Sequence, residues 1–489
     1  MNNKLHIFLV LIVLAFAFSS WSPATAQSST YQTIGHQNSL PVWYKNLVDR
    51  QSFPLSWTHG GQADFETWKQ AARAKVIECL MTPPPYVPFD PLVIDSVDRG
   101  SYMAYKVVFN VTGDSRVLAY KLVPKSAGPH PAVLLLHSHD GIFDIGKEKD
   151  IEPFNVPAAK LSSAKTLVNT SYGGKFIGDE MAKRGYVCLA VDMLNWSDRS
   201  GSDPANVQQA LASNMLHLGV SWPGLIAYED MRAADFLAHQ NEVDSTRIAA
   251  MGLSVGGFRT WQIAALSPYI AAGVSVCWMS THAGLMVPGN NQTKGQSSYS
   301  MLHPSLAQYL DYPDVASIAC PKPMMFCNGN ADPLFPLQSI KDAHAKMREV
   351  WDSQNAGDKL ITKLYDSFHQ FSLEMQADAF PWLDSLFNNT ATGIKIQTAL
   401  KKENIPLSIF PNPAKKEAII SYELSKSSNA RGVLVDSLGK EVVLFVDEVQ
   451  RAGKYNLYVN TSGLSNATYI VRLVINGEQT SKSLTVLNP

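Results

Sequence analysis

The 489-residue sequence predicts an open, doubly wound α/β sheet followed by a small antiparallel β-sandwich. Between about residues 102 and 387, short and continuously apolar runs alternate with longer helical stretches. This alternation is typical of parallel strands that helices cover on both faces. Beyond the stretch Asn388 to Gly393 the helical period disappears and apolar and polar residues alternate, as in half-buried strands. A length of 489 residues is enough for two to four domains of roughly 150 residues.

Composition excludes several classes of protein. Hydrophobic residues make up 46 % of the chain and charged residues 17 %, so it can bury substantial cores and is not a disordered tail. The 41 basic and 42 acidic side chains leave a formal charge of −1, which argues against nucleic acid as a partner. The five cysteines are scattered and form no Cys-x-x-Cys pair, so we expect buried thiols and neither a disulfide scaffold nor a zinc site.

The first 26 residues have the pattern of a signal peptide. Lys4 supplies the positive start, an apolar run extends from about Leu5 to Phe18, and Ala24 and Ala26 offer the small residues of a cleavage site. The apolar run is shorter than the ~20 residues that a membrane span needs. We therefore expect export, with Gln27 as the mature N-terminus and no stable membrane span.

Five segments follow from this organisation. We expect a signal peptide over 1–26, a lead-in over 27–95, a catalytic domain over 96–389, a linker over 390–405 and a sandwich over 406–489. The lead-in carries one predicted helix, Ala63 to Leu80, which the following prolines cannot continue. The predicted strands of the catalytic domain are Ala132 to Leu136, Val187 to Val191, Ile248 to Met251, Val274 to Trp278, Met324 to Cys327 and Leu360 to Tyr365. The predicted helices between them are Ile177 to Arg184, Tyr228 to His239, Gly257 to Leu266, Ile340 to Val350 and Leu373 to Leu386.

The C-terminal segment has alternating strand patterns separated by turns of Gly, Asn and Ser, which is typical of a small β-sandwich. The predicted strands are Ala418 to Leu424, Val433 to Val435, Tyr455 to Val459, Tyr469 to Ile475 and Ser483 to Val486.

The sharpest local signal for chemistry is the string Gly252-Leu253-Ser254-Val255-Gly256. It lies where an apolar strand ends and a helical stretch begins, which is the context of a nucleophile elbow. Glycines on either side of the serine allow a sharp turn, and the helix start aims backbone N–H groups at the reacting carbon. The sequence therefore predicts Ser254 as the nucleophile.

A serine nucleophile needs a base and a carboxylate that orients the base. In this architecture the acid follows a later strand and the histidine follows the last strand. Asp332 lies in the loop after the strand that ends near Cys327, and His369 follows the final predicted strand. Asp366 is the second choice for the acid, because it lies on or near the same strand as the histidine.

Two backbone N–H groups should hold the oxyanion of the tetrahedral intermediate. One is the N–H of Val255, and the other should come from the loop His137-Ser138-His139-Asp140-Gly141, which follows an earlier strand. Within this loop we prefer the N–H of His139, with Ser138 next. The two histidines and the aspartate leave a metal site open as an alternative, although no further ligand cluster is visible.

The segment from about 95 to 390 resembles an α/β-hydrolase of the dienelactone-hydrolase-like and acetyl-xylan-esterase-like branch. The resemblance rests on Asp230 to Leu237, on Val243 to Ile248 and on the elbow that follows. It implies that Ser254, Asp332 and His369 are the catalytic residues. Dienelactone hydrolases themselves have cysteine at the elbow, so serine here favours general ester hydrolysis. Many relatives have glycine at the position of Ser138.

Two insertions should shape the substrate pocket, Ile142 to Gly174 and Ser280 to Pro313, because both leave the carboxyl ends of strands. Trp196 and Trp278 are the candidate substrate-binding residues, with Trp222 and Trp261 as further aromatic candidates. We interpret Asp192 as a loop anchor rather than as a second catalytic acid.

The C-terminal segment resembles a type IX secretion sorting domain. The matching features are Phe410 to Pro413, Gly453 to Tyr455, Gly463 to Tyr469 and Gly477 with Glu478. The resemblance implies passage through a Gram-negative outer membrane by a secretion machinery. A carbohydrate-binding or adhesive sandwich is the alternative.

The sequence thus predicts an exported serine carboxylic-ester hydrolase that needs no cofactor or metal and acts through an acyl-enzyme. The resemblance and the export signals favour an acylated polysaccharide or another external ester as substrate. A secreted peptidase or amidase is one alternative, because the same three residues can cleave amides. A surface binding protein on an inactive hydrolase scaffold is the other.

Overall fold

The computed structural model describes residues 35–37, 39–61, 64–80, 83–287, 290–387, 406–436, 441–476 and 478–488. The predicted signal peptide and linker lie outside the described residues. The chain divides into a short N-terminal unit up to Leu47 and a large unit from Val48 onward. In the short unit, strands β1 (His36–Gln37) and β2 (Leu40–Pro41) form an antiparallel pair, and helix α2 (Tyr44–Asp49) begins within it.

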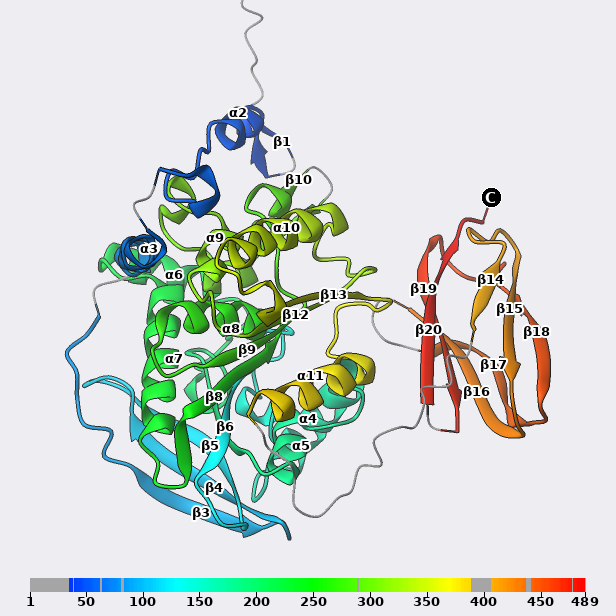
Figure 1. The fold of residues 1–489 in the computed structure, drawn as a ribbon, viewed down its shortest axis with the longest axis horizontal. Helices are drawn as coiled ribbons and strands as arrows, with labels where there is room; N and C mark the ends of the chain where they lie inside the picture. Colours follow the sequence, from blue (N-terminus) through cyan, green and yellow to red (C-terminus); the bar gives the residue numbers. More distant parts are fainter. Residues whose placement is uncertain are drawn as a thin grey trace, which may run out of the picture. The chain divides into compact units, whose positions relative to one another are not determined.

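The large unit is built on a nine-stranded sheet with the order β13-β12-β9-β8-β6-β7-β5-β4-β3 (Figure 1). Strands β6 to β9, β12 and β13 run parallel, whereas β3, β4 and β5 form an antiparallel meander at one edge. The sheet confirms the predicted α/β class. Its strands are β3 (Leu92–Asp98), β4 (Tyr102–Asn110), β5 (Arg116–Pro124), β6 (His130–Leu136), β7 (Val187–Val191), β8 (Val243–Leu253), β9 (Ala272–Val276), β12 (Met324–Gly329) and β13 (Leu360–Tyr365).

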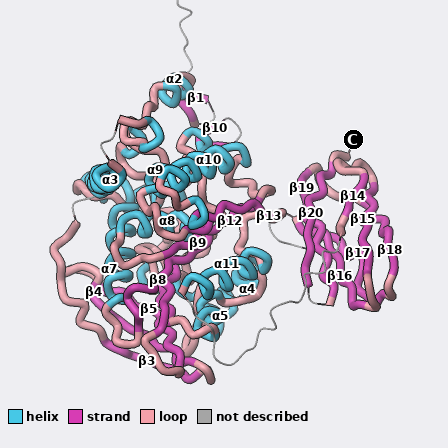
Figure 2. Tube along the Cα trace, in the orientation of Figure 1, coloured by secondary structure: helices cyan, strands magenta, loops and turns pink. Residues whose placement is uncertain are grey.

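Helices cover both faces of this sheet, as Figure 2 shows in cyan. One core cluster joins the sheet to α3, α7, α8, α9 and α10, and a second joins it to α4, α5 and α11. The helices are α3 (Phe65–Leu80), α4 (Ala158–Ser171), α5 (Ile177–Lys183), α6 (Gln208–His217), α7 (Trp222–Ala238), α8 (Val255–Leu266), α9 (Tyr312–Ser317), α10 (Leu337–Ser353) and α11 (Leu373–Leu386). Short 3₁₀ turns and one two-stranded pair lie in the loops, namely η1 (Trp57–His59), η2 (Lys147–Lys149), η3 (Ser197–Arg199), η4 (Ala283–Leu285), β10 (Met286–Val287), β11 (Asn290–Asn291), η5 (Gln296–Ser300), η6 (Leu306–Gln308) and η7 (Gly357–Lys359).

Element boundaries differ from the sequence predictions where capping and backbone conformation intervene. Helix α7 begins at Trp222, six residues before the predicted start, because the Ser221 side chain accepts the N–H of Gly224 and caps it. Strand β9 ends at Val276 rather than at Trp278, because Cys277 has a φ of 50°, which a strand cannot continue.

The predicted lead-in is part of the same core as the sheet. Buried residues of helix α3, Phe65, Trp68, Ala72 and Val76, belong to the core cluster that contains strands β6 and β8. The boundary expected at residue 95 falls inside strand β3. The edge meander and helices α4 and α6 were not among the predicted elements.

The C-terminal segment forms a three-stranded sheet, β14-β15-β18, and a four-stranded sheet, β17-β16-β19-β20. One apolar cluster takes residues from both sheets, including Ile420, Leu434 and Val471, as in a sandwich. This confirms the predicted β-sandwich. Its strands are β14 (Ser408–Phe410), β15 (Glu417–Leu424), β16 (Ser428–Val435), β17 (Glu441–Gln450), β18 (Gly453–Asn460), β19 (Ala467–Ile475) and β20 (Glu478–Val486).

Candidate active site

Ser254 occupies the turn between strand β8 and helix α8, where the sequence places it. Its backbone has φ 57° and ψ −123°, a conformation that costs an L residue about 1–3 kcal/mol. The backbone N–H of Ser254 donates to the carbonyl of Val276 at 2.8 Å, which ties the turn to strand β9. A strained serine at the turn between a strand and a helix has the backbone geometry of a nucleophile elbow.

The glycines on either side of Ser254 are required by space. A Cβ atom on Gly252 would overlap the carbonyl oxygen of Leu136 and the backbone of Gly256, and one on Gly256 would overlap that same oxygen. Neither glycine has a positive φ, so packing rather than backbone freedom selects them. Leu136 is the last residue of strand β6, so the turn at Ser254 packs directly against the start of the His137 loop.

Asp332 and His369 form a hydrogen-bonded pair. Asp332 follows strand β12 and His369 follows strand β13, and Nδ1 of His369 lies 2.7 Å from Oδ2 of Asp332. The other carboxylate oxygen of Asp332 accepts the backbone N–H of Leu334 at 2.9 Å. The Asp332 side chain is fully buried, so its charge is poorly screened by water. The histidine bonds to Asp332 rather than to Asp366.

This pairing changes the acidity of His369. Burial disfavours the charged imidazolium, but the Asp332 carboxylate outweighs burial and raises the pKa of His369 above its ordinary value. Cys277 packs beside the pair, and its Sγ and one ligand atom each of Asp332 and His369 lie within 4.8 Å of one another. Burial raises the pKa of the Cys277 thiol well above its ordinary value, so the thiolate that a metal would need is disfavoured.

Ser254 and His369 line the same cavity, which has a volume of about 310 Å³. Besides these two residues, His139 and Asp140 of the His137 loop also line the cavity. Most of the other lining residues are apolar, among them Trp278, Met301 and Phe335, and the polar ones are Gln292, Thr293, Ser297 and Ser298. The cavity can therefore hold a group of considerable size and low polarity next to a nucleophile and a base.

Two candidate oxyanion donors border this cavity. Val255 is the first residue of helix α8, so its backbone N–H has no partner within the helix. Among the described residues, no hydrogen bond is recorded from the backbone N–H of His139. Both residues line the cavity with Ser254, so their N–H groups are the candidates for an oxyanion hole.

The histidine rings of the His137 loop are engaged in protein hydrogen bonds. Nε2 of His137 accepts the backbone N–H of Met193 at 3.0 Å, and its Nδ1 lies 2.9 Å from the carbonyl of Ser138. Nδ1 of His139 accepts the N–H of Gly141 at 3.0 Å, so Nε2 carries the proton and donates to Gln208 at 2.8 Å. Burial lowers the pKa of both rings. With all four nitrogens in use, the alternative of a metal site on this loop has no support.

The tryptophans predicted as substrate contacts lie in different surroundings. Trp278 lines the cavity, and its indole N–H donates to Sδ of Met301 at 2.9 Å. Trp196 is fully buried, packs 5.1 Å from the ring of His139 and stacks toward Trp222. Trp196, Trp222 and Trp261 are not among the described residues that line the cavity. Trp196 therefore supports the loop from behind, and its predicted role as a substrate contact has no support.

Comparison with known proteins gives two family matches. Residues 37–382 match the Abhydrolase family, and residues 408–487 match the secretion system C-terminal sorting domain. The second match confirms the predicted type IX sorting domain and export to the cell surface or the extracellular space. Among the residues that the structure describes, no helix has the length and apolarity needed to cross a membrane.

Individual relatives agree with the first match. A Bacillus subtilis (strain 168) protein named as a hydrolase, YtaP, is 29 % identical over 262 residues, which cover 53 % of this chain and 80 % of the relative. A Bacteroides fragilis structure described as an acetyl xylan esterase has a TM-score of 0.52 at 18 % identity and covers 67 % of this chain and 82 % of its own. A glucuronoyl esterase from Solibacter usitatus has a TM-score of 0.50 at 13 % identity, and the match covers 66 % of this chain and 94 % of the esterase. At these identities the two structures share the fold.

Proposed function

The chain belongs to the Abhydrolase family, and on this premise we propose that it is an exported serine carboxylic-ester hydrolase. One observation carries the proposal. Ser254, which has a strained backbone at its turn, lines the same cavity as His369. Nδ1 of His369 is hydrogen-bonded to the buried Asp332. These are the three parts that nucleophilic catalysis by serine requires.

In the proposed reaction, the hydroxyl of Ser254 attacks the ester carbonyl while Nε2 of His369 takes its proton. The N–H groups of Val255 and His139 hold the resulting oxyanion. Collapse of the tetrahedral intermediate breaks the bond to the alcohol, which leaves with the proton from His369. Water then attacks the acyl-enzyme by the same route and releases the acid and free Ser254. Asp332 keeps His369 in the tautomer that accepts at Nε2.

The cavity supports a neutral ester as substrate. Among the described lining residues, none is Arg or Lys, and Asp140 adds a carboxylate to the rim, so an anionic group next to the ester is disfavoured. Export and the esterase names of the two structural neighbours favour an external ester, and we propose an acylated polysaccharide. The apolar part of the lining fits the acyl group, whereas a sugar, whose hydroxyls need hydrogen-bond partners, fits better beside polar lining residues such as Ser297 and Ser298.

A serine-directed phosphonate tests the nucleophile. We expect one covalent adduct on Ser254 after peptide mapping, with Ser297, a second hydroxyl lining the cavity, unlabelled. Ser254→Ala should abolish hydrolysis of p-nitrophenyl acetate, because Ser254 is the proposed nucleophile that His369, hydrogen-bonded to Asp332, deprotonates. An adduct elsewhere, or full activity in Ser254→Ala, would remove the mechanism.

Substrate panels separate the enzyme from its alternatives. We expect hydrolysis of p-nitrophenyl acetate and of acetylated xylan, and none of peptide anilides. Cleavage of the anilides at a comparable rate would favour a peptidase or amidase. No turnover of any ester by a folded protein would favour the binding protein.

A further inference from the structure

The loop that borders the cavity rests on a buried run of charged residues. Lys147, Glu148 and Lys149 form the 3₁₀ turn η2, and Asp150 follows. All four side chains are buried. Charged side chains are rarely buried without a reason, because each loses its hydration. The contacts of each residue therefore show what the turn does.

Among the described residues, the ammonium group of Lys149 has its hydrogen bonds and its ion pair with the His137 loop. Its Nζ donates to the carbonyl of Ser138 at 2.7 Å and to the carbonyl of His139 at 2.9 Å. Oδ2 of Asp140 lies 3.3 Å from the same nitrogen. A lysine has three donors and no acceptor, so three consecutive loop residues occupy its full capacity. Burial lowers the pKa of Lys149, and the Asp140 carboxylate opposes that effect.

Fixing these carbonyls also fixes the direction of the neighbouring N–H groups. In a trans peptide the C=O of one residue and the N–H of the next point in opposite directions. When Lys149 binds the carbonyl of Ser138, the N–H of His139 must therefore point away from Lys149. His139 lines the cavity, and no partner for its N–H is recorded within the described ranges. The lysine thus orients the group proposed as the second oxyanion donor.

A second buried cation holds the preceding carbonyl. Arg259 of helix α8 donates from Nη1 to the carbonyl of His137 at 3.3 Å. Its Nε and Nη2 donate to the carboxylate of Asp230 at 2.8 and 2.6 Å, which fixes the guanidinium. Helix α8 begins with Val255, the other proposed donor. Two cations therefore fix three successive carbonyls of the loop, and one of them comes from the helix that supplies the first donor.

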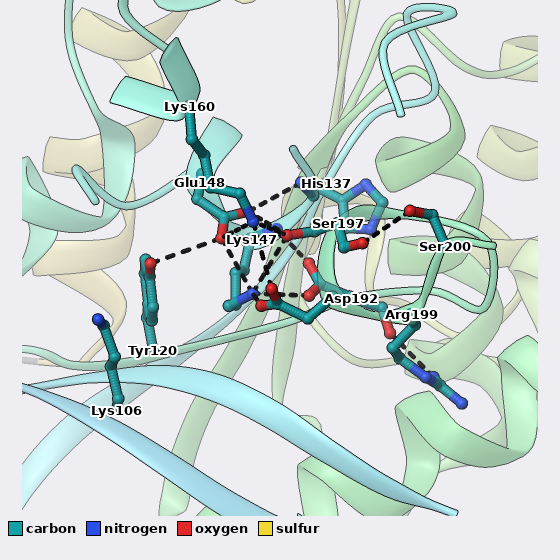
Figure 3. Close-up of polar contacts among 12 residues, drawn as sticks. Lys106, Tyr120, His137, Lys147, Glu148, Lys160, Asp192, Ser197, Arg199 and Ser200 are labelled. Carbon is teal, nitrogen blue, oxygen red and sulfur yellow. Dashed lines mark hydrogen bonds and ion pairs between the residues drawn. The ribbon is translucent and has the colours of Figure 1, made fainter. Parts of the chain in front are cut away.

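The turn that carries Lys149 is itself anchored through its other residues, and Figure 3 shows the polar contacts of Lys147 and Glu148. Lys147 donates to Asp192 from its backbone N–H and from Nζ, each at 2.7 Å. Ser197 donates to both carboxylate oxygens of Glu148 at 3.0 and 3.1 Å. These contacts fix the backbone from which Lys149 extends, so its ammonium has little freedom to follow a moving loop.

We propose that Lys149 is a positioning residue that holds the His137 loop with the N–H of His139 aimed at the oxyanion. The inference rests on the proposed function, because it assigns a role within the same ester hydrolysis. Lys149 does not line the cavity among the described residues, so it acts through the loop. Without Lys149, the His137 loop should lose its fixed orientation, which weakens binding of the transition state more than binding of the substrate.

A matched control separates positioning from folding. Lys322 is a half-buried lysine that also holds two carbonyls, those of Ala264 at 2.8 Å and Ser267 at 3.0 Å. These carbonyls lie at the far end of helix α8 from Ser254. Burial lowers the pKa of Lys322 to about 8. Lys322→Met therefore removes the same kind of lysine–carbonyl contact from the far end of helix α8 without touching the loop.

The experiment compares Lys149→Met with Lys322→Met in the full chain. Steady-state kinetics on p-nitrophenyl acetate give kcat and KM, and inhibition by an aryl trifluoromethyl ketone reports binding of an oxyanion adduct. The matching methyl ketone reports binding without an oxyanion. Thermal unfolding followed by circular dichroism shows whether each variant is folded. If Lys149→Met does not fold, Lys149→Gln, which keeps a donor and removes the charge, takes its place.

We expect Lys149→Met to lower kcat about 10- to 100-fold, part of the 100- to 1000-fold cost of losing a whole donor. KM and methyl ketone affinity should change less than about threefold, and trifluoromethyl ketone affinity should fall in parallel with kcat. Lys322→Met should keep kcat within about threefold. Equal kcat in the two variants, or a loss confined to KM or to stability, would overturn the role of Lys149. If Ser254→Ala were active, the proposed function itself would fail, and that outcome is independent of this comparison.

Discussion

Replacing Asp332 by asparagine tests the charge pair at the centre of the site. The amide has the size of the carboxylate but carries no charge. Its NH₂ group can donate to Nδ1 of His369, the nitrogen that lies 2.7 Å from Asp332. The ring would then carry its proton on Nε2, which faces away from the aspartate, and could not accept the proton of Ser254.

The size of the effect follows from burial. The Asp332 side chain is fully buried, so water does little to screen its interaction with the imidazolium that forms in the transition state. Two opposite charges about 4 Å apart attract by about 4 kcal/mol at an effective dielectric constant of about 20. Loss of the correct tautomer adds to this, and a total near 5.5 kcal/mol corresponds to a fall in kcat of about 10⁴-fold.

The assay is the pH dependence of p-nitrophenyl acetate hydrolysis. Only neutral His369 can act as the base, so activity should rise with pH through its pKa. Because Asp332 raises that pKa, the acid limb of the wild-type profile should lie above the ordinary histidine value of about 6.5. In Asp332→Asn, burial still lowers the pKa of His369 and only the weaker effect of Asp140 opposes it, so the residual activity should have its acid limb at lower pH.

The same pair makes a prediction for stability. A folded-state pKa above the unfolded value means that the pair stabilises the fold fully below about pH 6.5 and that this contribution is lost as pH rises through the folded pKa.

Asp366→Asn is the matched control for the kinetic effect of Asp332→Asn. His369 bonds to Asp332 and not to Asp366, so Asp366→Asn should keep kcat within about threefold. A mild effect of Asp332→Asn together with a large effect of Asp366→Asn would refute the assignment.

Two further predictions concern packing around the nucleophile and the cavity wall. Gly256→Ala should lower stability by about 1–3 kcal/mol and abolish activity, because its Cβ would overlap the carbonyl of Leu136. Gly201→Ala, with open space at its Cβ, should leave the thermal unfolding midpoint almost unchanged, and equal midpoints for the two variants would contradict the packing argument. Trp278→Ala should shift the preference among p-nitrophenyl esters toward longer acyl chains, because Trp278 lines the cavity. Trp261→Phe removes a fully buried indole with an unpaired N–H and should leave that ranking unchanged, so a shift of equal size there would contradict the proposed wall.

The sequence predicted the parts of the site that follow from strand order. Ser254, Asp332 and His369 each follow an apolar strand run, and parallel strands bring their carboxyl ends to one edge of a sheet. Strand β7 and helix α11 have the predicted bounds, because a continuous apolar run and a capped periodic helix are strong local signals. The edge meander was missed, since antiparallel strands at an edge carry a weaker apolar signal.

Side-chain surroundings were predicted less well than backbone elements. Trp196 and Trp278 both follow strands of the sheet, and no feature of the sequence separates them. Their exposure to the cavity depends on the insertions that pack over them, which one sequence does not determine. The run from Lys147 to Asp150 has the local pattern of a solvated turn, because consecutive charges are usually exposed. Its burial depends on partners such as Asp192 that are distant in sequence.

That buried run bears on how the site keeps its geometry outside the cell. Taking Lys147 and Lys149 out of water costs several kcal/mol for each charge, and their carboxylate and carbonyl partners must offset it. A hydrophobic turn of the same size could stabilise the fold as well, but it could not bind carbonyl oxygens. Because three successive carbonyls of the His137 loop are bound by cations, the charges are better explained by loop orientation than by stability. The comparison of Lys149→Met with Lys322→Met measures that difference directly.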